Sequence, residues 1–329
     1  MGIPSGSAGW DFVFASALPE TILDAKQIAE MTGIDEGFLI KKVGVHQRHV
    51  LAEGEQALDL AEAATRKALE RANLQAGDLD GLIYVTQNPD YILPQSSALL
   101  SHRLGCRNSL CSFDLSLGCS GWVYAITIAA AMADAQDLQK LAIVTCDTYT
   151  PRLARDDKAT MAVFGDAAAA TLLLRGGDYH IGKGVFGTDG SSGFELSARG
   201  GELNPQNADK QIPPIIRMNG RSILEFMLTR VPDSVNDCLL LNNVNRADID
   251  CFAFHQASEY MVRLLIREMD LDEDRVPLNI NLVGNTVSST IPMLLEKTLQ
   301  DQPSINKIIV SGFGVGLSWA TNYIFKTTG

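Results

Sequence analysis

The chain repeats the same pattern of segments once. Its first half carries "DLDGLIYVTQN", "LSLGCSGWVYAITIAAAM", "LQKLAIVTCDT" and "FGDAAAATLLL", and its second half carries "DIDCFAFHQAS", "NLVGNTVSSTIPMLLEKTL", "INKIIVSGFGV" and "GLSWATNYIF" in the same order. Each half predicts a strand, an elbow of glycine and polar residues that leads into a helix, and two further strands. The repeat therefore restricts the chain to a fold with two similar halves. We place them at residues 1–176 and 177–329.

The segments themselves indicate the α/β class. The short apolar runs GLIYV, LAIVT, CFAF and KIIVS are typical of strands that are buried on both faces, with helices covering the sheets. Residues 55–74 have apolar side chains at three- and four-residue intervals with charged residues opposite, which predicts an amphipathic surface helix. The helix that follows Cys119 is apolar on every side, so we expect it in the middle of the molecule, between the sheets.

Aligning the halves brings distant residues into correspondence. Gly118 and Cys119 fall on Gly284 and Asn285, and the strand that ends at His255 falls on the one that ends near Gln87. If the halves pack about a pseudo-twofold axis, Cys119 and Asn285 both lie at the starts of central helices and face one cavity. This arrangement would let residues from both halves form a single site.

The composition excludes some classes of function. The formal net charge of −12 argues against a general nucleic-acid surface, because phosphate binding depends on clustered Lys and Arg. The 329 residues contain neither a secretory signal nor an apolar run long enough for a membrane span, so we expect a soluble, cytoplasmic protein. Six cysteines lie scattered with no zinc-ligand spacing, which predicts reduced thiols and no metal site.

Cys119 is the candidate nucleophile. A thiol at a helix N-terminus lies near unpaired N–H groups and the positive end of the helix dipole, and both favour the reactive thiolate. The alternative is that Cys119 is an inert core residue, since free cysteines are commonly buried. We keep that second interpretation for Cys106, Cys111, Cys146, Cys238 and Cys251.

His255 and Asn285 are the candidate partners of Cys119. His255 ends an apolar strand, where side chains commonly face a site, and histidine handles protons or polarises carbonyl groups near neutral pH. Structural roles are the alternatives: a core histidine, and an asparagine that caps a helix. The repeat-related positions of the three residues strengthen the functional interpretation.

Several motifs in order resemble the thiolase-like condensing enzymes, and most closely the beta-ketoacyl-acyl-carrier-protein synthase III family. They are "DEGFLIKKVGVHQRHV", "LGCSGWVYA", "AVFGDAAAA", "FHQAS", "VGNTVSSTIP" and "SGFGVGLSWA", which together span nearly the whole chain. The resemblance implies a five-layered α-β-α-β-α sandwich of two pseudo-twofold-related halves. It also implies a homodimer.

The resemblance further implies an acyltransferase that takes part in fatty-acid biosynthesis or related lipid metabolism. Cys119 would take an acyl group from acyl-CoA, and His255 and Asn285 would then hold a malonyl thioester as it loses carbon dioxide and condenses with that group. The backbone N–H groups of Cys119 and Val315 match the family's oxyanion hole. Coenzyme A enters as a thioester substrate, and no cofactor or metal is implied. The extender would be malonyl-ACP or malonyl-CoA.

The chain departs from the family where the substrate binds. The family's CoA-stacking tryptophan is matched by Phe38 and its two nucleotide-binding arginines by Lys42 and Lys158, so a stacking ring and point charges remain without bidentate phosphate recognition. Arg221 takes the place of an asparagine of the pantetheine tunnel, and Tyr260 that of a basic residue used in docking the carrier protein. These departures suggest a specialised relative.

Two other functions remain open at the level of the sequence. The acyl group on Cys119 could pass to an oxygen or nitrogen nucleophile, in secondary-metabolite or sugar biosynthesis, with His255 as general base. The chain could also be an inactive scaffold subunit, although the intact set of Cys119, His255 and Asn285 argues against it. The length of the acyl chain and its pathway do not follow from the residues.

Overall fold

The computed structural model describes residues 9–154, 156–199 and 215–327. Within them, ten strands form the large sheet, in the order β12-β13-β14-β8-β1-β7-β6-β4-β5 with β9 paired to β14. These strands are β1 (Trp10–Ala17), β4 (Gly81–Val85), β5 (Cys111–Leu115), β6 (Lys140–Asp147), β7 (Ala167–Arg175), β8 (Tyr179–Ile181), β9 (Val185–Thr188), β12 (Cys251–Phe254), β13 (Lys307–Gly314) and β14 (Ser318–Lys326). The short pairs are β2 (Ile22–Asp24) with β3 (Gln47–His49), and β10 (Leu196–Arg199) with β11 (Ile215–Met218).

The strand pairing confirms the repeat. In the first half β4 runs parallel to β6, and β6 runs antiparallel to β7; in the second half β12 runs parallel to β13, and β13 runs antiparallel to β14. β8 joins the two halves into one sheet, since it pairs with β14 over three residues and with β1 through Trp10 and Tyr179 alone. The boundary between residues 176 and 177 falls between β7 and β8 and stays a prediction.

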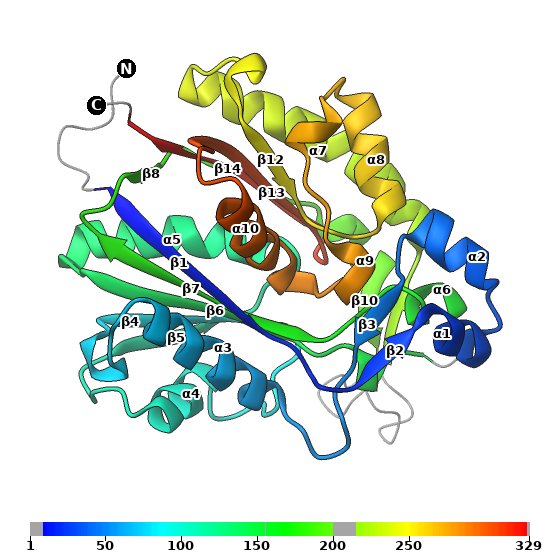
Figure 1. Ribbon diagram of the computed structural model, residues 1–329, viewed down its shortest axis with the longest axis horizontal. Helices are drawn as coiled ribbons and strands as arrows, with labels where there is room; N and C mark the ends of the chain where they lie inside the picture. Colours follow the sequence, from blue (N-terminus) through cyan, green and yellow to red (C-terminus); the bar gives the residue numbers. More distant parts are fainter. Residues whose placement is uncertain (1–8, 155, 200–214, 328–329) are drawn as a thin grey trace.

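The helices complete a five-layered α/β sandwich, as the resemblance implies (Figure 1). One outer layer contains α3 (Ala57–Arg71) and α4 (Ser96–Leu104), the middle layer α5 (Gly121–Gln136) and α10 (Thr290–Asp301), and the other outer layer α7 (Gly220–Asn242) and α8 (Glu259–Glu268). The shorter helices are α1 (Ala25–Thr32), α2 (Glu36–Phe38), α6 (Lys158–Met161) and α9 (Ile280–Val283). No helix in the described part of the chain is both long and apolar enough to span a membrane.

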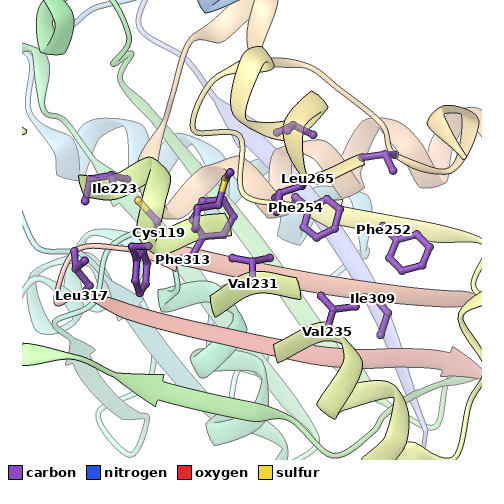
Figure 2. Packing of buried hydrophobic residues seen from close by; sticks show 14 of the residues in the cluster. Cys119, Ile223, Val231, Val235, Phe252, Phe254, Leu265, Ile309, Phe313 and Leu317 are labelled. Atoms are coloured by element: carbon purple, nitrogen blue, oxygen red, sulfur yellow. The ribbon is translucent and has the colours of Figure 1, made fainter. Parts of the chain in front are cut away.

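The hydrophobic core follows the same layers. One cluster fills the space under α3, a second surrounds α5 and α10 between the two halves of the sheet, and a third lies between the second half-sheet and α7 and α8. Figure 2 shows the third cluster, in which Cys119 lies at one end near Phe313 and Ile223. The thiol therefore lies at the border between core and cavity.

The two predicted helices lie where we expected them. α3 buries Leu58, Leu60 and Ala64 on one face and keeps its charged residues outward, as an amphipathic helix should. α5 begins two residues after Cys119 and buries Trp122, Val123 and Ile126 between the half-sheets. Its apolar composition is thus explained by its burial in the central layer.

Candidate active site

Cys119 lies in the turn between β5 and α5, directly before the N-cap residue Ser120. Its side chain is 4% exposed, and the amide of Gly121 donates to the carbonyl of Gly118 at 2.7 Å, which closes the turn. β13 approaches this turn closely: a β-carbon on Gly312 would lie 2.5 Å from the Cys119 carbonyl oxygen, and one on Gly314 would lie 2.9 Å from Cys119 Sγ. Glycine at both positions is therefore required for β13 to lie against the thiol.

Burial raises the pKa of Cys119, and the negative charge of Asp147 raises it further. The backbone N–H groups of Cys119 and Val315 both hydrogen-bond to the sulfur, and these bonds act to lower its pKa. The N–H groups thus favour the thiolate, as the sequence predicts, whereas burial among the surrounding layers opposes it.

Asp147 is fully buried at the end of β6 and contacts both halves. Its Oδ1 accepts hydrogen bonds from the hydroxyl of Thr86 at 3.1 Å and the amide of Gln87 at 3.0 Å, and its Oδ2 accepts one from the hydroxyl of Ser288 at 2.5 Å. Burial raises the pKa of Asp147, while these donors act to lower it. This carboxylate ties the ends of β4 and β6 to the segment that follows Asn285.

We expect Asp147→Asn to lower the pKa of Cys119, because the substitution removes a negative charge that disfavours the thiolate. Alkylation by iodoacetamide should accelerate at a given mildly alkaline pH, by about tenfold for each pKa unit of the shift. The measurement is the alkylation rate as a function of pH. Asp114→Asn is the matched control, because Asp114 likewise accepts hydrogen bonds at both carboxylate oxygens, in its case from the backbone N–H groups of Ser96 and Ser97. A profile that stays unchanged or moves to higher pH would contradict the expectation.

His255 directly follows β12 and is 1% exposed. Its Nδ1 lies 2.7 Å from the hydroxyl oxygen of Thr290, and its ring meets that of Phe313 edge-to-face at 5.4 Å. Burial lowers the pKa of His255 to about 3, so the imidazole is neutral at neutral pH. The side chain is thus held from two sides in its uncharged form.

Asn285 lies in a short parallel bridge with Phe164, before the 3-10 turn Val287–Ser289 and α10. The expectation that it starts the central helix is therefore wrong by one turn, because this 3-10 turn separates it from α10. The amide of Val287 donates to Asn285 Oδ1 at 2.9 Å. With its oxygen held in this way, Asn285 presents Nδ2 as a hydrogen-bond donor.

The structure brings these three side chains together. Cys119, His255 and Asn285 line one cavity of about 560 Å³, although they come from different segments of the chain. Phe313 and Gly314 of β13 line the same space, and its walls are mostly apolar. The cavity therefore contains a thiol, a neutral imidazole and an amide donor in mostly apolar surroundings.

The residues expected to bind substrate divide into two groups. Phe38, Lys42 and Arg221 line this same cavity, and Phe38 is 51% exposed at its mouth. The guanidinium of Arg221 binds Glu225 of its own helix at 2.9 Å, whereas no ion pair of Lys42 is found among the described residues. Lys158 is exposed at the start of α6, close to Gly33, and is not among the lining residues.

Val315 lies in the turn between β13 and β14, and its backbone N–H hydrogen-bonds to Cys119 Sγ. The hydroxyl of Ser318 donates to the Val315 carbonyl at 2.7 Å and lies 2.8 Å from the hydroxyl of Ser120, the N-cap residue of α5. Two serines thus link this turn to the start of the helix. They fix the Val315 amide relative to the thiol.

The sequence alone missed Thr290, Asp147 and Gly314 as residues that contact or orient the site. Gly314 had a signal in the glycines of "GFGVG", which suggest a close backbone approach. Thr290 and Asp147 had none, because each is one polar residue among several in its segment. Within the described residues, no three His, Cys, Asp or Glu side chains gather as a metal site would require.

Comparisons with known proteins agree with this arrangement. Residues 113–190 match the family model of 3-oxoacyl-[acyl-carrier-protein] synthase III, and residues 239–324 match the model of its C-terminal part. The chain is 30% identical over 312 residues to the beta-ketoacyl-[acyl-carrier-protein] synthase III of Clostridium beijerinckii, which covers 93% of this chain and 96% of the relative.

Solved structures give the same result. A 3-oxoacyl-(acyl-carrier-protein) synthase III superposes with a TM-score of 0.91 at 32% identity, over 96% of this chain and 99% of that one. The 3-oxoacyl-(acyl-carrier protein) synthase of Burkholderia xenovorans superposes with a TM-score of 0.89 at 29% identity, over 97% and 95% of the two chains.

Proposed function

Because this chain belongs to the 3-oxoacyl-[acyl-carrier-protein] synthase III family and is an acyltransferase of the condensing type, we propose that Cys119 carries its acyl group during the reaction. The observation that carries this proposal is the shared cavity of Cys119, His255 and Asn285. A cysteine nucleophile divides a difficult acyl transfer into two easier steps. The proposed substrate is a coenzyme A thioester, with no resident cofactor.

In the first step, Cys119 Sγ forms a bond to the acyl carbonyl carbon, and the bond from that carbon to the sulfur of coenzyme A breaks. Overall, the proton of the thiol ends on the coenzyme A that departs. The N–H groups of Cys119 and Val315 support this step, because they face the position of the sulfur and can donate to the oxyanion that develops beside it.

In the second step, the carbon–carbon bond to the carboxylate of a malonyl thioester breaks, carbon dioxide departs, and the electron pair remains as an enolate. The enolate carbon attacks the acyl carbon, and Cys119 leaves as a thiolate that water reprotonates. We propose that Asn285 Nδ2 and His255 hold the enolate oxygen. Donors fixed in an apolar cavity are effective for a charge that develops only in the transition state.

The residues at the mouth of the cavity support the proposal that the substrate carries a nucleotide. Phe38 offers an exposed ring for the adenine, and Lys42 offers a cation for phosphate groups. Lys158 would contact the same nucleotide from α6. Arg221 is paired with Glu225 on the exposed first turns of α7, so we assign it to the rim of the tunnel rather than to the phosphates. The extender would arrive as malonyl-ACP or malonyl-CoA.

The alternative acceptors are not favoured, because the relatives at about 30% identity are named beta-ketoacyl-[acyl-carrier-protein] synthase III. We propose that the chain acts in fatty-acid biosynthesis or a related lipid pathway, and that it does so in the cytoplasm. We also retain the two halves at residues 1–176 and 177–329 as proposed domains.

We propose a homodimer on three features. β5 is the last strand of the large sheet, so its outer edge is open in the single chain. α5 keeps partly exposed apolar side chains, including Tyr124, Ile128 and Met132. In the loop before α4, Ile92 is 72% and Leu93 83% exposed. A second copy that covers these surfaces would bury apolar area that is otherwise left in water.

The test combines two measurements on the purified protein. A panel of acyl-CoAs should shift its intact mass by one acyl group, and malonyl-CoA or malonyl-ACP added afterwards should release carbon dioxide and discharge that group. Acylation without carbon dioxide release, with discharge to an added alcohol or amine, would favour the acyltransferase alternative. No adduct with any acyl-CoA would favour an inactive scaffold.

A further inference from the structure

The partner of His255 Nδ1 is a hydroxyl group. Thr290 Oγ1 lies 2.7 Å from that nitrogen, and both side chains are buried. A hydroxyl can donate one hydrogen bond and accept others, whereas a carbonyl only accepts and an amide N–H only donates. Thr290 is therefore compatible with a proton on either ring nitrogen of His255.

We infer that Thr290 is a positioning residue that lets His255 hold its proton on Nδ1 during acyl loading and on Nε2 during condensation. This inference rests on the proposed function, and it adds a residue and a division of roles to it. The two steps require opposite behaviour from the same nitrogen. Nε2 must accept a proton from the thiol in the first step and donate a hydrogen bond to the thioester oxygen in the second.

The geometry of the free protein corresponds to the first of these states. The Thr290 hydroxyl donates to the carbonyl of Val287 at 3.1 Å. Its lone pairs then face His255, so Nδ1 carries the proton and Nε2 is left as the acceptor. Cys119 and His255 line one cavity, so Nε2 in this state can take the thiol proton as the sulfur attacks.

The second state requires the Thr290 hydroxyl to turn from Val287 to His255 Nδ1. This rotation leaves no carbonyl unsatisfied, because the backbone N–H of Thr290 also donates to the Val287 oxygen. The hydroxyl then donates to an unprotonated Nδ1, and Nε2 carries the proton. Asn285 Nδ2 and His255 Nε2 are thereby both donors to one oxygen.

The choice between tautomers matters because a doubly protonated ring is costly at this position. Burial lowers the pKa of His255 to about 3, and among the described residues no carboxylate is hydrogen-bonded to the ring. A lasting imidazolium that served both steps is thus disfavoured. During loading, Nε2 takes the Sγ proton as the new carbon–sulfur bond forms, and it returns that proton to the coenzyme A sulfur as the old bond breaks. Exchange with water in the open tunnel then interconverts the neutral tautomers.

Thr290→Val keeps the shape of the side chain but removes the hydroxyl, and Thr290→Ser keeps the hydroxyl. We expect Thr290→Val to slow both acyl loading, followed by intact mass, and carbon dioxide release from malonyl-CoA, each by about 10- to 100-fold, as for other partners that orient a histidine. Thr290→Ser should stay within about threefold of the parent in both steps. Thr286→Val is the matched control, because Thr286 is a buried threonine of the same segment whose hydroxyl faces Met293.

Nitrogen-15 NMR of histidine-labelled protein reads the tautomers directly. His255 should carry its proton on Nδ1 in the free parent, and on Nε2 when the acylated enzyme binds a malonyl-CoA analogue whose carboxylate is replaced by a sulfonate. A single tautomer in both states would overturn the inference, as would a Thr290→Val protein that keeps both rates or a Thr290→Ser protein as slow as Thr290→Val. A parent chain that never forms an acyl adduct would instead overturn the proposed function, while the free-state spectrum would still test the contact with Thr290.

Discussion

Replacing Cys119 by serine is expected to abolish the acyl adduct and to lower the rate of condensation by roughly a thousandfold or more, as removal of a catalytic nucleophile does in other enzymes. The hydroxyl has nearly the same size, so the packing against β13 should survive. Its pKa is far higher and its oxygen is a weaker nucleophile, and the donors around it remain. The measurement is the intact mass after exposure to acyl-CoA, together with the rate of carbon dioxide release.

Cys111→Ser provides the control for this experiment, because Cys111 is an exposed free cysteine on β5, outside the cavity. It should leave the adduct and both rates unchanged. An acyl adduct that persists in the Cys119→Ser protein and disappears in the Cys111→Ser protein would show that Cys111 carries the acyl group. That result would refute the proposal for Cys119.

The fold could be predicted from the sequence because its main signal is periodic. Runs such as GLIYV and KIIVS form β4 and part of β13, and their order repeats in both halves, so local patterns carried the global arrangement. The link through β8 could not be predicted, because it depends on only one residue pair with β1. The 3-10 turn that separates Asn285 from α10 was also missed, since Asn285 is held before it by donating its N–H to the Val163 carbonyl and accepting from the Val287 amide.

The candidate site, like the fold, could be predicted only in part. The shared cavity of Cys119, His255 and Asn285 could be predicted, because each lies at a position that the repeat relates to another. The ionisation of Cys119 could not be predicted, because burial and the charge of Asp147 are properties of the packed layers and not of the turn around the thiol. Thr290 acts through a contact across 35 residues of sequence, which no local pattern records.

Asn285→Asp is the substitution that should best separate the two steps. The aspartate keeps an oxygen that accepts from the Val287 amide, so the local structure should persist. It replaces the Nδ2 donor with a second oxygen, and its negative charge repels the enolate. We expect carbon dioxide release and condensation to fall by about 10²- to 10³-fold, the usual cost of losing one such donor.

The acyl adduct on Cys119 should still form in the Asn285→Asp protein, because the first step uses the N–H groups of Cys119 and Val315 rather than the amide of Asn285. Rapid mixing with acyl-CoA followed by intact-mass analysis gives the loading rate, and labelled malonyl-CoA gives the release of carbon dioxide. Equal losses in both steps would mean that Asn285 supports the geometry of the whole cavity, and the assignment of its Nδ2 to the enolate oxygen would fail. A selective loss in the second step is the result that the fixed orientation of this amide requires.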